Sequence, residues 1–224
     1  MMPRFAVAAV AALLAAPALA GPGRGPDPSL AAITPVAERL DVGLAGEMPA
    51  DIARYVLANG ARSASLSPDG RHVAVLSSLT GLRQLWIVPA GGGQPRQLSF
   101  GNGVTDWRWA PDGQSLVYAA DNDGNEQEAF YRISTDGRRE TRVVPAKDGA
   151  FRVMGDVLPD NRRIVFASTE RNGLDYDVFI RDLHTGEQSL VHEGRYLWYP
   201  QPVSPDGRWL LLTEAVGADS DNLS

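Results

Sequence analysis

The densest group of residues that could do chemistry is the polar run Asp121-Asn122-Asp123-Gly124-Asn125-Glu126. Alternating carboxylate and amide oxygens are typical calcium ligands, but a calcium loop of the usual kind has Gly at its sixth position and Glu at its twelfth. Those two positions hold Glu126 and Arg132 instead. The spacing therefore favours a polar hairpin loop over a metal site, and we expect neither a metal ion nor a cofactor.

Covalent chemistry has little support in the sequence. The chain has no cysteine, which excludes disulfides, thiol nucleophiles and thiolate metal ligands. No G-x-S-x-G occurs, and this is the strained turn on which an α/β-hydrolase presents its serine. The three histidines, His72, His184 and His192, fall at predicted strand or loop positions without a nucleophile partner. We therefore expect no catalytic residue in this chain.

Four aspartates recur in one short pattern and have a mechanical explanation. They are Asp69, Asp112, Asp160 and Asp206, in the stretches "SPDG", "APDG", "LPDN" and "SPDG". Proline presets φ at the second position of a type I turn, and glycine suits the fourth. Asn161 replaces the glycine once, and asparagine tolerates the left-handed backbone better than most residues do. The pattern predicts turns, so we assign these carboxylates to structure rather than to catalysis.

The spacing of the turns predicts the fold. Their prolines, at positions 68, 111, 159 and 205, are 43, 48 and 46 residues apart. A period of about 45 residues is typical of a four-stranded propeller blade. A short alternating strand precedes each turn and an apolar strand follows it, and two further strands complete the first three units. We predict an all-β propeller with blades at about 61–100, 101–146 and 149–193, and an incomplete fourth at 194–224, about three and a half blades in all.

The N-terminal 60 residues have a different character. "MMPR" followed by "FAVAAVAALLAA" and Ala18-Leu19-Ala20 is typical of a secretory signal peptide over residues 1–20. An uncleaved anchor is the alternative, but the apolar run is about a dozen residues long and a membrane span needs about 20. Residues 21–60 form a Pro/Gly linker followed by a short helical segment, "MPADIARYVLANG". From Arg62 the period becomes alternating, which marks the domain boundary near residue 61.

Charge and hydropathy limit the location and the partners. The chain has 21 basic and 27 acidic residues, a net charge of −6, and removal of Arg4 with the signal peptide makes it −7. An acidic exported protein is poorly suited to nucleic acid or anionic lipid. No second apolar run reaches membrane length. We expect a periplasmic or secreted protein without a membrane span after signal cleavage.

The repeat resembles that of two known families. Its pattern, W/L-S/A-P-D-G, apolar strand, polar loop, apolar strand, D-x-x-G and Q-L-S, is similar to the propellers of TolB-type proteins and of prolyl oligopeptidase family serine peptidases. TolB-type proteins have an α/β domain of more than a hundred residues before the propeller, whereas only 40 residues separate Ala20 from Ala61 here. "EMPADIARYVLANGARSASLSPDG" and "DNDGNEQEAFYRISTDG" resemble the first-blade start and second-blade loop of the peptidases. The resemblance favours the peptidase family.

That resemblance implies a two-domain enzyme in which the propeller covers an α/β-hydrolase domain. This chain lacks the hydrolase domain, so we expect a truncated product or gene fragment whose propeller gates or binds peptide substrate. Glu126 is the substrate-binding candidate, because the resemblance places its loop at the domain interface or the peptide. The alternative is a TolB-like propeller that binds periplasmic protein partners. A third interpretation, a hydrolase with a metal in its channel, lacks a cluster of ligands.

Aromatic and acidic stretches leave smaller questions open. Trp107 and Trp109 alternate on a first strand and share a face, which predicts packing between blades or, alternatively, an aromatic wall for a ligand. The stretch Tyr196–Pro200 is dense enough in aromatics to contribute to a ligand surface, although a first strand that lines the channel would look similar. Asp175-Tyr176-Asp177 and Asp219-Ser220-Asp221 are interpreted as solvated acidic loops.

Overall fold

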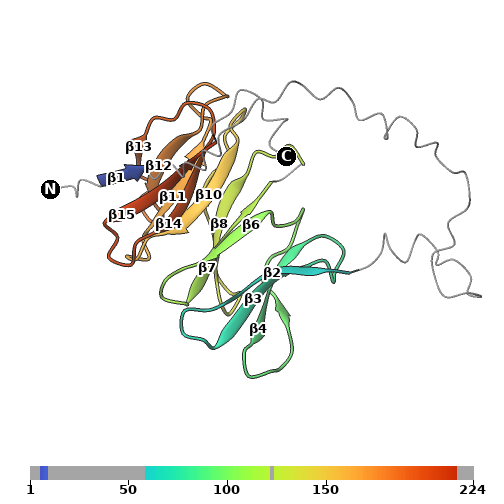
Figure 1. Ribbon diagram of the computed structural model, residues 1–224. Helices are drawn as coiled ribbons and strands as arrows, with labels where there is room; N and C mark the ends of the chain where they lie inside the picture. Colours follow the sequence, from blue (N-terminus) through green and yellow to red (C-terminus); the bar gives the residue numbers. More distant parts are fainter. Residues whose placement is uncertain (1–5, 10–58, 122–123, 216–224) are drawn as a thin grey trace, which may run out of the picture. The chain divides into compact units, whose positions relative to one another are not determined.

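The structure is a computed structural model that describes residues 6–9, 59–121 and 124–215 (Figure 1). All of these residues fall in one compact unit of the chain. The described part contains strands and no helix, which confirms the all-β prediction. The predicted linker and the predicted helix before residue 59 lie outside the described residues.

Four sheets account for the strands (Figure 1). The first contains β2 (Ala61–Leu66), β3 (His72–Ser77), β4 (Gln84–Pro89) and β5 (Arg96–Gln97). The second contains β6 (Asp106–Trp109), β7 (Ser115–Ala120), β8 (Ala129–Ser134) and β9 (Glu140–Val144). The third contains β10 (Arg152–Val157), β11 (Arg163–Ser168), β12 (Asp177–Asp182) and β13 (Gln188–His192). The fourth contains β14 (Trp198–Val203), β15 (Trp209–Glu214) and β1 (Ala6–Ala9).

Each of the first three sheets is an antiparallel meander in chain order, as expected of a propeller blade. In the fourth sheet, β14 and β15 pair in the same antiparallel way, and β1 pairs with β15 in parallel. Strands β2 to β15 lie where the repeat predicts them, on both sides of the four turns, whereas no strand was predicted at β1. The signal-peptide interpretation of residues 1–20 stays a prediction.

The repeated turns have the geometry that their sequence predicts. In each, the fourth residue donates its N–H to the carbonyl of the first, as Gly70 does to Ser67 at 2.9 Å. The aspartate carboxylate then accepts the backbone N–H of the residue two positions later, for example that of Arg71 at 3.0 Å from Asp69. Asn161 has φ of 57°, close to the 71° of Gly70. The structural role assigned to the aspartates is confirmed, and so is the left-handed conformation expected of Asn161.

Apolar side chains fill the space between successive sheets. One cluster joins the first sheet to the second through Leu76, Ile87 and Trp107. A second cluster joins the second sheet to the third, where the Phe130 and Phe166 rings meet edge to face with centroids 5.7 Å apart. A third cluster joins the third sheet to β14 and β15. The core is therefore a series of interfaces between blades, which positions each sheet by its neighbours.

The meanders define two ends of the described unit. The turn end carries the four repeated turns, at residues 67–70, 110–113, 158–161 and 204–207. Adjacent turns meet there, since Asn161 Oδ1 accepts the N–H of Asp112 at 2.7 Å. The loop end carries the loops between second and third strands and the connections between sheets, at 78–83, 98–105, 121–128, 145–151, 169–176 and 193–197.

Candidate functional site

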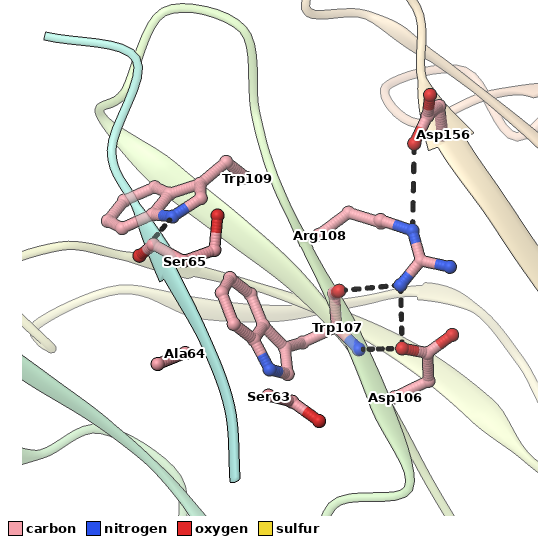
Figure 2. Close-up of a pocket in the computed structure, with 8 residues that line it drawn as sticks. All are labelled: Ser63, Ala64, Ser65, Asp106, Trp107, Arg108, Trp109 and Asp156. Carbon is pink, nitrogen blue, oxygen red and sulfur yellow. Dashed lines mark hydrogen bonds and ion pairs between the residues drawn. The ribbon is translucent and has the colours of Figure 1, made fainter. Parts of the chain in front are cut away.

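A pocket of about 470 Å³ opens on the first strands of three consecutive sheets (Figure 2). Its lining residues are Ser63, Ala64 and Ser65 of β2, Asp106, Trp107, Arg108 and Trp109 of β6, and Asp156 of β10. The volume is within the usual range of small-ligand sites. Since no single blade could form it, the pocket depends on the packing of the blades.

Arg108 lies at the centre of the polar side of the pocket. Its Nη1 donates to Asp106 Oδ1 at 2.6 Å and to the Trp107 carbonyl at 2.8 Å. Its Nε lies 3.6 Å from Asp156 Oδ1, on the neighbouring sheet. Two carboxylates therefore surround one guanidinium, as Figure 2 shows, and these three side chains together carry a net negative charge.

The two tryptophans of the pocket, Trp107 and Trp109, differ in burial. Trp107 is 6% exposed and belongs to the core between the first and second sheets, as predicted. Trp109 packs against the same core at its edge, with the two rings 6.3 Å apart and nearly perpendicular. Its Nε1 donates to the Ser65 carbonyl at 3.3 Å. Both rings also line the pocket, so packing and an aromatic wall are combined here.

Ser63 adds an unusual backbone to this site. Its φ is 55°, and the β2–β3 register shifts between Arg62 and Ser65, which marks a β-bulge. A left-handed backbone is uncommon for a residue other than glycine. Because such strain is often found at functional sites, Ser63 joins the candidates that sequence reasoning missed. No pattern in "RSASL" distinguishes it.

Glu126, the substrate-binding candidate, lies on the exposed loop between β7 and β8. Its φ is 61°, and its N–H donates to Asp121 Oδ2 at 3.1 Å. The other oxygen of Asp121 accepts the N–H of Gly124 at 3.0 Å. Asp121 thus fixes the hairpin loop that the sequence favours here, and the Glu126 side chain extends from this loop at the loop end.

Glu128, two residues further on, was not predicted. Burial raises the pKa of the Glu128 carboxyl above its ordinary value, and the nearby charges of Asp106 and Asp121 add to the effect. A hydrogen bond with Thr105 and the charge of Arg152 act in the opposite direction. Asp106 lines the pocket, so the negative potential there extends toward the loop end.

Arg152 supports this region from the third sheet. Its side chain is 3% exposed, and Nη1 donates to the carbonyls of Glu128 at 2.7 Å and Pro145 at 2.6 Å. Burial lowers the pKa of Arg152, against the charge of Glu170, whose Oε2 lies 3.8 Å from Nη2. Arg152 therefore holds the end of the Glu126 loop against the next blade. A lone arginine 24 positions from Glu128 gives no sequence signal for this contact.

One sequence interpretation is wrong. Asp177 does not lie in a solvated loop, because its side chain is fully buried. Arg171 donates to its two oxygens at 2.7 and 3.0 Å, and Gly194 donates its N–H at 2.8 Å. The close approach of Gly194 to the Tyr176 carbonyl, where a Cβ would lie 1.9 Å away, closes the loop over this carboxylate. The other acidic stretch, at 219–221, lies outside the described residues.

The aromatic stretch at the start of β14 contains both buried and exposed side chains. Trp198 is buried in the core, whereas Tyr196 and Tyr199 are each 37% exposed. Tyr196 has φ of 71°, and Asp175 Oδ1 accepts its N–H at 2.7 Å. Burial raises the pKa of Tyr176, with contributions from Tyr199, Glu128 and Glu126. Tyr176 and Tyr199 therefore lie near Glu126 and Glu128 of the loop between β7 and β8.

Large apolar side chains are exposed at the same end. On the loops and sheet connections of the loop end they are Leu79, Leu82, Phe100, Phe151 and Leu174. Phe100 is 74% exposed, the largest fraction in this set. Scattered apolar residues need no explanation, but several on one end are typical of an interaction surface.

The arrangement supplies groups that can recognise a ligand. It offers carboxylates, aromatic rings and apolar loops. Within the described residues, no group of three or more His, Asp or Glu side chains is placed to hold a metal ion. The same part of the chain contains no helix long and apolar enough to cross a membrane.

Comparison with known families places the chain by its repeat. A family model described as the TolB beta propeller domain matches residues 50–223, which is most of the chain. The match includes all four repeated turns.

Two characterised relatives are peptidases by name. Dipeptidyl-peptidase 5 of Porphyromonas endodontalis is 27% identical over 223 residues, covering 75% of this chain and 32% of that protein. Dipeptidyl aminopeptidase BIII of Pseudoxanthomonas mexicana is 23% identical over 131 residues, covering 57% of this chain and 19% of that protein. The chain therefore spans a third or less of these relatives.

Among solved structures, a protein described as a putative TolB from Agrobacterium tumefaciens is similar to this chain. It has a TM-score of 0.55 and 25% identity, and the match covers 64% of this chain and 50% of that one. The similarity thus extends to both types of protein that share the repeat.

Proposed function

The chain belongs to the TolB beta propeller domain family, and from that premise we propose that it is the propeller portion of an exported prolyl oligopeptidase-like serine peptidase. Its task is to gate or bind peptide substrate for an α/β-hydrolase domain. Export is proposed on the signal-peptide pattern of residues 1–20. Similarity to two peptidases, each matched over less than a third of its length, supports the assignment.

The observation that carries the proposal is the character of the loop end. Phe100, Leu174 and the other apolar side chains named above are exposed there. The loop between β7 and β8, with Glu126 and Glu128, and Tyr199 are at the same end. A second domain seated on this end would cover the apolar side chains.

Glu126 is the proposed contact with the peptide. Its carboxylate is exposed on a loop that Asp121 fixes from within and Arg152 holds from the next blade. A carboxylate whose backbone is held by a hydrogen bond presents its charge at a defined place, which lowers the entropy cost of binding. A carboxylate there is suited to a positively charged group of a peptide, and the tyrosines beside it offer cation–π contacts.

A kinetic experiment tests this assignment on the product of the complete gene. We expect Glu126→Gln to raise KM for peptide substrates about threefold or more with kcat unchanged, because binding is lost equally in ground and transition states. Glu187→Gln, at an exposed position of the turn end, is the matched control and should leave both constants unchanged. Equal kinetics for the two variants would remove Glu126 from the site.

The TolB-like alternative is favoured by the structural similarity to the Agrobacterium protein. In that case the loop end would bind a partner protein of the cell envelope. A complete gene product that hydrolyses no peptide but binds an envelope protein through Phe100 and Leu174 would establish this alternative.

A further inference from the structure

A second pocket, of about 500 Å³, lies at the turn end of the second sheet. Its lining includes Ser115, Arg132, Ser134, Asp136, Arg139 and Thr141, all from β7, β8, β9 or the turn between the last two. Arg132 Nη1 donates to the Asn161 carbonyl at 3.0 Å, so the pocket reaches the third sheet. The pocket lies at the opposite end of the sheets from the loop end, and the proposed function does not involve it.

The repeat itself shows that Arg132 is exceptional. In each sheet, one residue of the third strand pairs with the residue six positions after the proline of the turn. These pairs are Ile87 with Ala74, Arg132 with Val117 and Ile180 with Val165. Ile87 and Ile180 are buried in the clusters that join their sheets to the next. At the interface between the second and third sheets, an arginine stands where an isoleucine would close the core.

The next position along the third strand shows the same replacement of isoleucine by arginine. Ile133 packs in the interface between the first and second sheets, and the equivalent residue of the third sheet is Arg181. Arg181 Nε donates to the Val143 carbonyl at 3.1 Å, across the next interface. Two positions that hold isoleucine at the interface between the first and second sheets therefore hold arginine at the interface between the second and third sheets. This makes the turn end of the second interface polar and positively charged.

Two guanidinium groups of the pocket retain donors for a ligand. Arg132 Nε donates to Ser115 Oγ at 2.9 Å, and with the Asn161 contact this fixes the side chain. Among the described residues, neither Arg132 Nη2 nor the Arg139 guanidinium has a hydrogen-bond or ion-pair partner. The one lining carboxylate, Asp136, accepts Ser134 Oγ at 2.5 Å and the Arg138 N–H at 3.0 Å. The charge of the pocket therefore remains positive.

We propose that this pocket binds a phosphate group. Arg132 and Arg139 provide charge-assisted donors, and the Thr141 hydroxyl adds a neutral one on the same face as Arg132, with which it pairs across the strands. A guanidinium fork suits the oxygens of phosphate, and a fixed one binds at lower entropy cost. The group is carried either by the free ion or by a small ester.

Calorimetric titration of the purified chain tests this proposal, with inorganic phosphate and glycerol 3-phosphate as probes and chloride at matched ionic strength as the blank. We expect saturable binding at one site. Arg132→Ile, which restores the residue type of the other blades, should abolish it, and Arg139→Gln should weaken it at least tenfold. Tighter binding of glycerol 3-phosphate identifies an ester as the ligand, whereas equal binding shows that the phosphate group alone is recognised.

Arg142→Gln is the control, because Arg142 is exposed, is not among the lining residues and lies on the opposite face of the sheet from Thr141. It should leave binding within twofold. Equal weakening by Arg142→Gln and Arg139→Gln would show non-specific attraction and overturn the proposal. Absence of saturable binding by the wild-type chain, folded as judged by circular dichroism, would overturn it too.

Discussion

At the scale of single residues, Asp177 is the clearest stabilising group at the loop end. Its buried carboxylate accepts two hydrogen bonds from Arg171 and one from the Gly194 N–H. Asp177→Ala should lower the free energy of unfolding by about 2–3 kcal/mol, because it leaves buried donors unpaired while Arg171 can still reach solvent. Urea unfolding measures this, with the exposed Asp148→Ala as control. Indistinguishable midpoints for the two variants would contradict the buried contacts.

Glu128 gives a pH-dependent prediction. Its raised pKa means that the folded chain keeps this proton to a higher pH than the unfolded chain does. The stabilisation that this proton gives the folded chain is fully present below about pH 4, near the ordinary glutamate pKa. It is lost as the pH rises through the pKa of Glu128 in the folded chain. Glu128→Gln removes this loss, so its unfolding free energy relative to wild type should increase between pH 4 and pH 7. Urea unfolding at several pH values, with the exposed Glu187→Gln for comparison, tests this; parallel curves would refute it.

Single residues were also where the sequence was least informative. Asp177, Glu128 and Arg152 act through partners on other loops, and no local pattern records those partners. Asp177 was misinterpreted because a charged loop is usually solvated, whereas here Gly194 allows the backbone to close over the carboxylate. Trp107 was predicted correctly, because alternation on a strand next to a repeated turn determines which face is buried.

At the scale of elements, the repeated turn explains the regular placement of the strands. Asn161 combines a left-handed backbone with a side-chain bond to the neighbouring turn, through the Asp112 N–H. Asn161→Gly keeps the left-handed backbone but removes the side-chain hydrogen bond, so it should lower the free energy of unfolding by about 1 kcal/mol. Asn161→Ala also opposes the left-handed conformation and should cost about 2 kcal/mol. Chemical unfolding of both variants checks the order, and alanine being the milder change would contradict the geometry.

The elements were therefore the most predictable level. Proline, aspartate and glycine each restrict the backbone locally, so four copies of one turn located strands β2 to β15. Strand β1, which pairs with β15, was not predicted. The pockets were not predictable in this way. Each needs the packing of adjacent blades, and the difference between Arg132 and the isoleucines at equivalent positions is seen only when the sheets are compared in register.

At the scale of the whole molecule, the chain is a TolB-type propeller domain whose sequence contains no G-x-S-x-G motif. We expect the purified chain to hydrolyse no proline-containing peptide, since it has no G-x-S-x-G and no cysteine. A chromogenic dipeptide assay measures this. Turnover that a serine-directed inhibitor abolishes would show that the chain has a catalytic site of its own.

The most direct test of the assignment to a peptidase is the nucleotide sequence that follows the codon for Ser224. The proposal predicts a frame, continuous or after a single frameshift, that encodes further blades and then a G-x-S-x-G followed by Asp and His. A frame that completes the blades and then stops would contradict it and leave the TolB-like propeller as the better account.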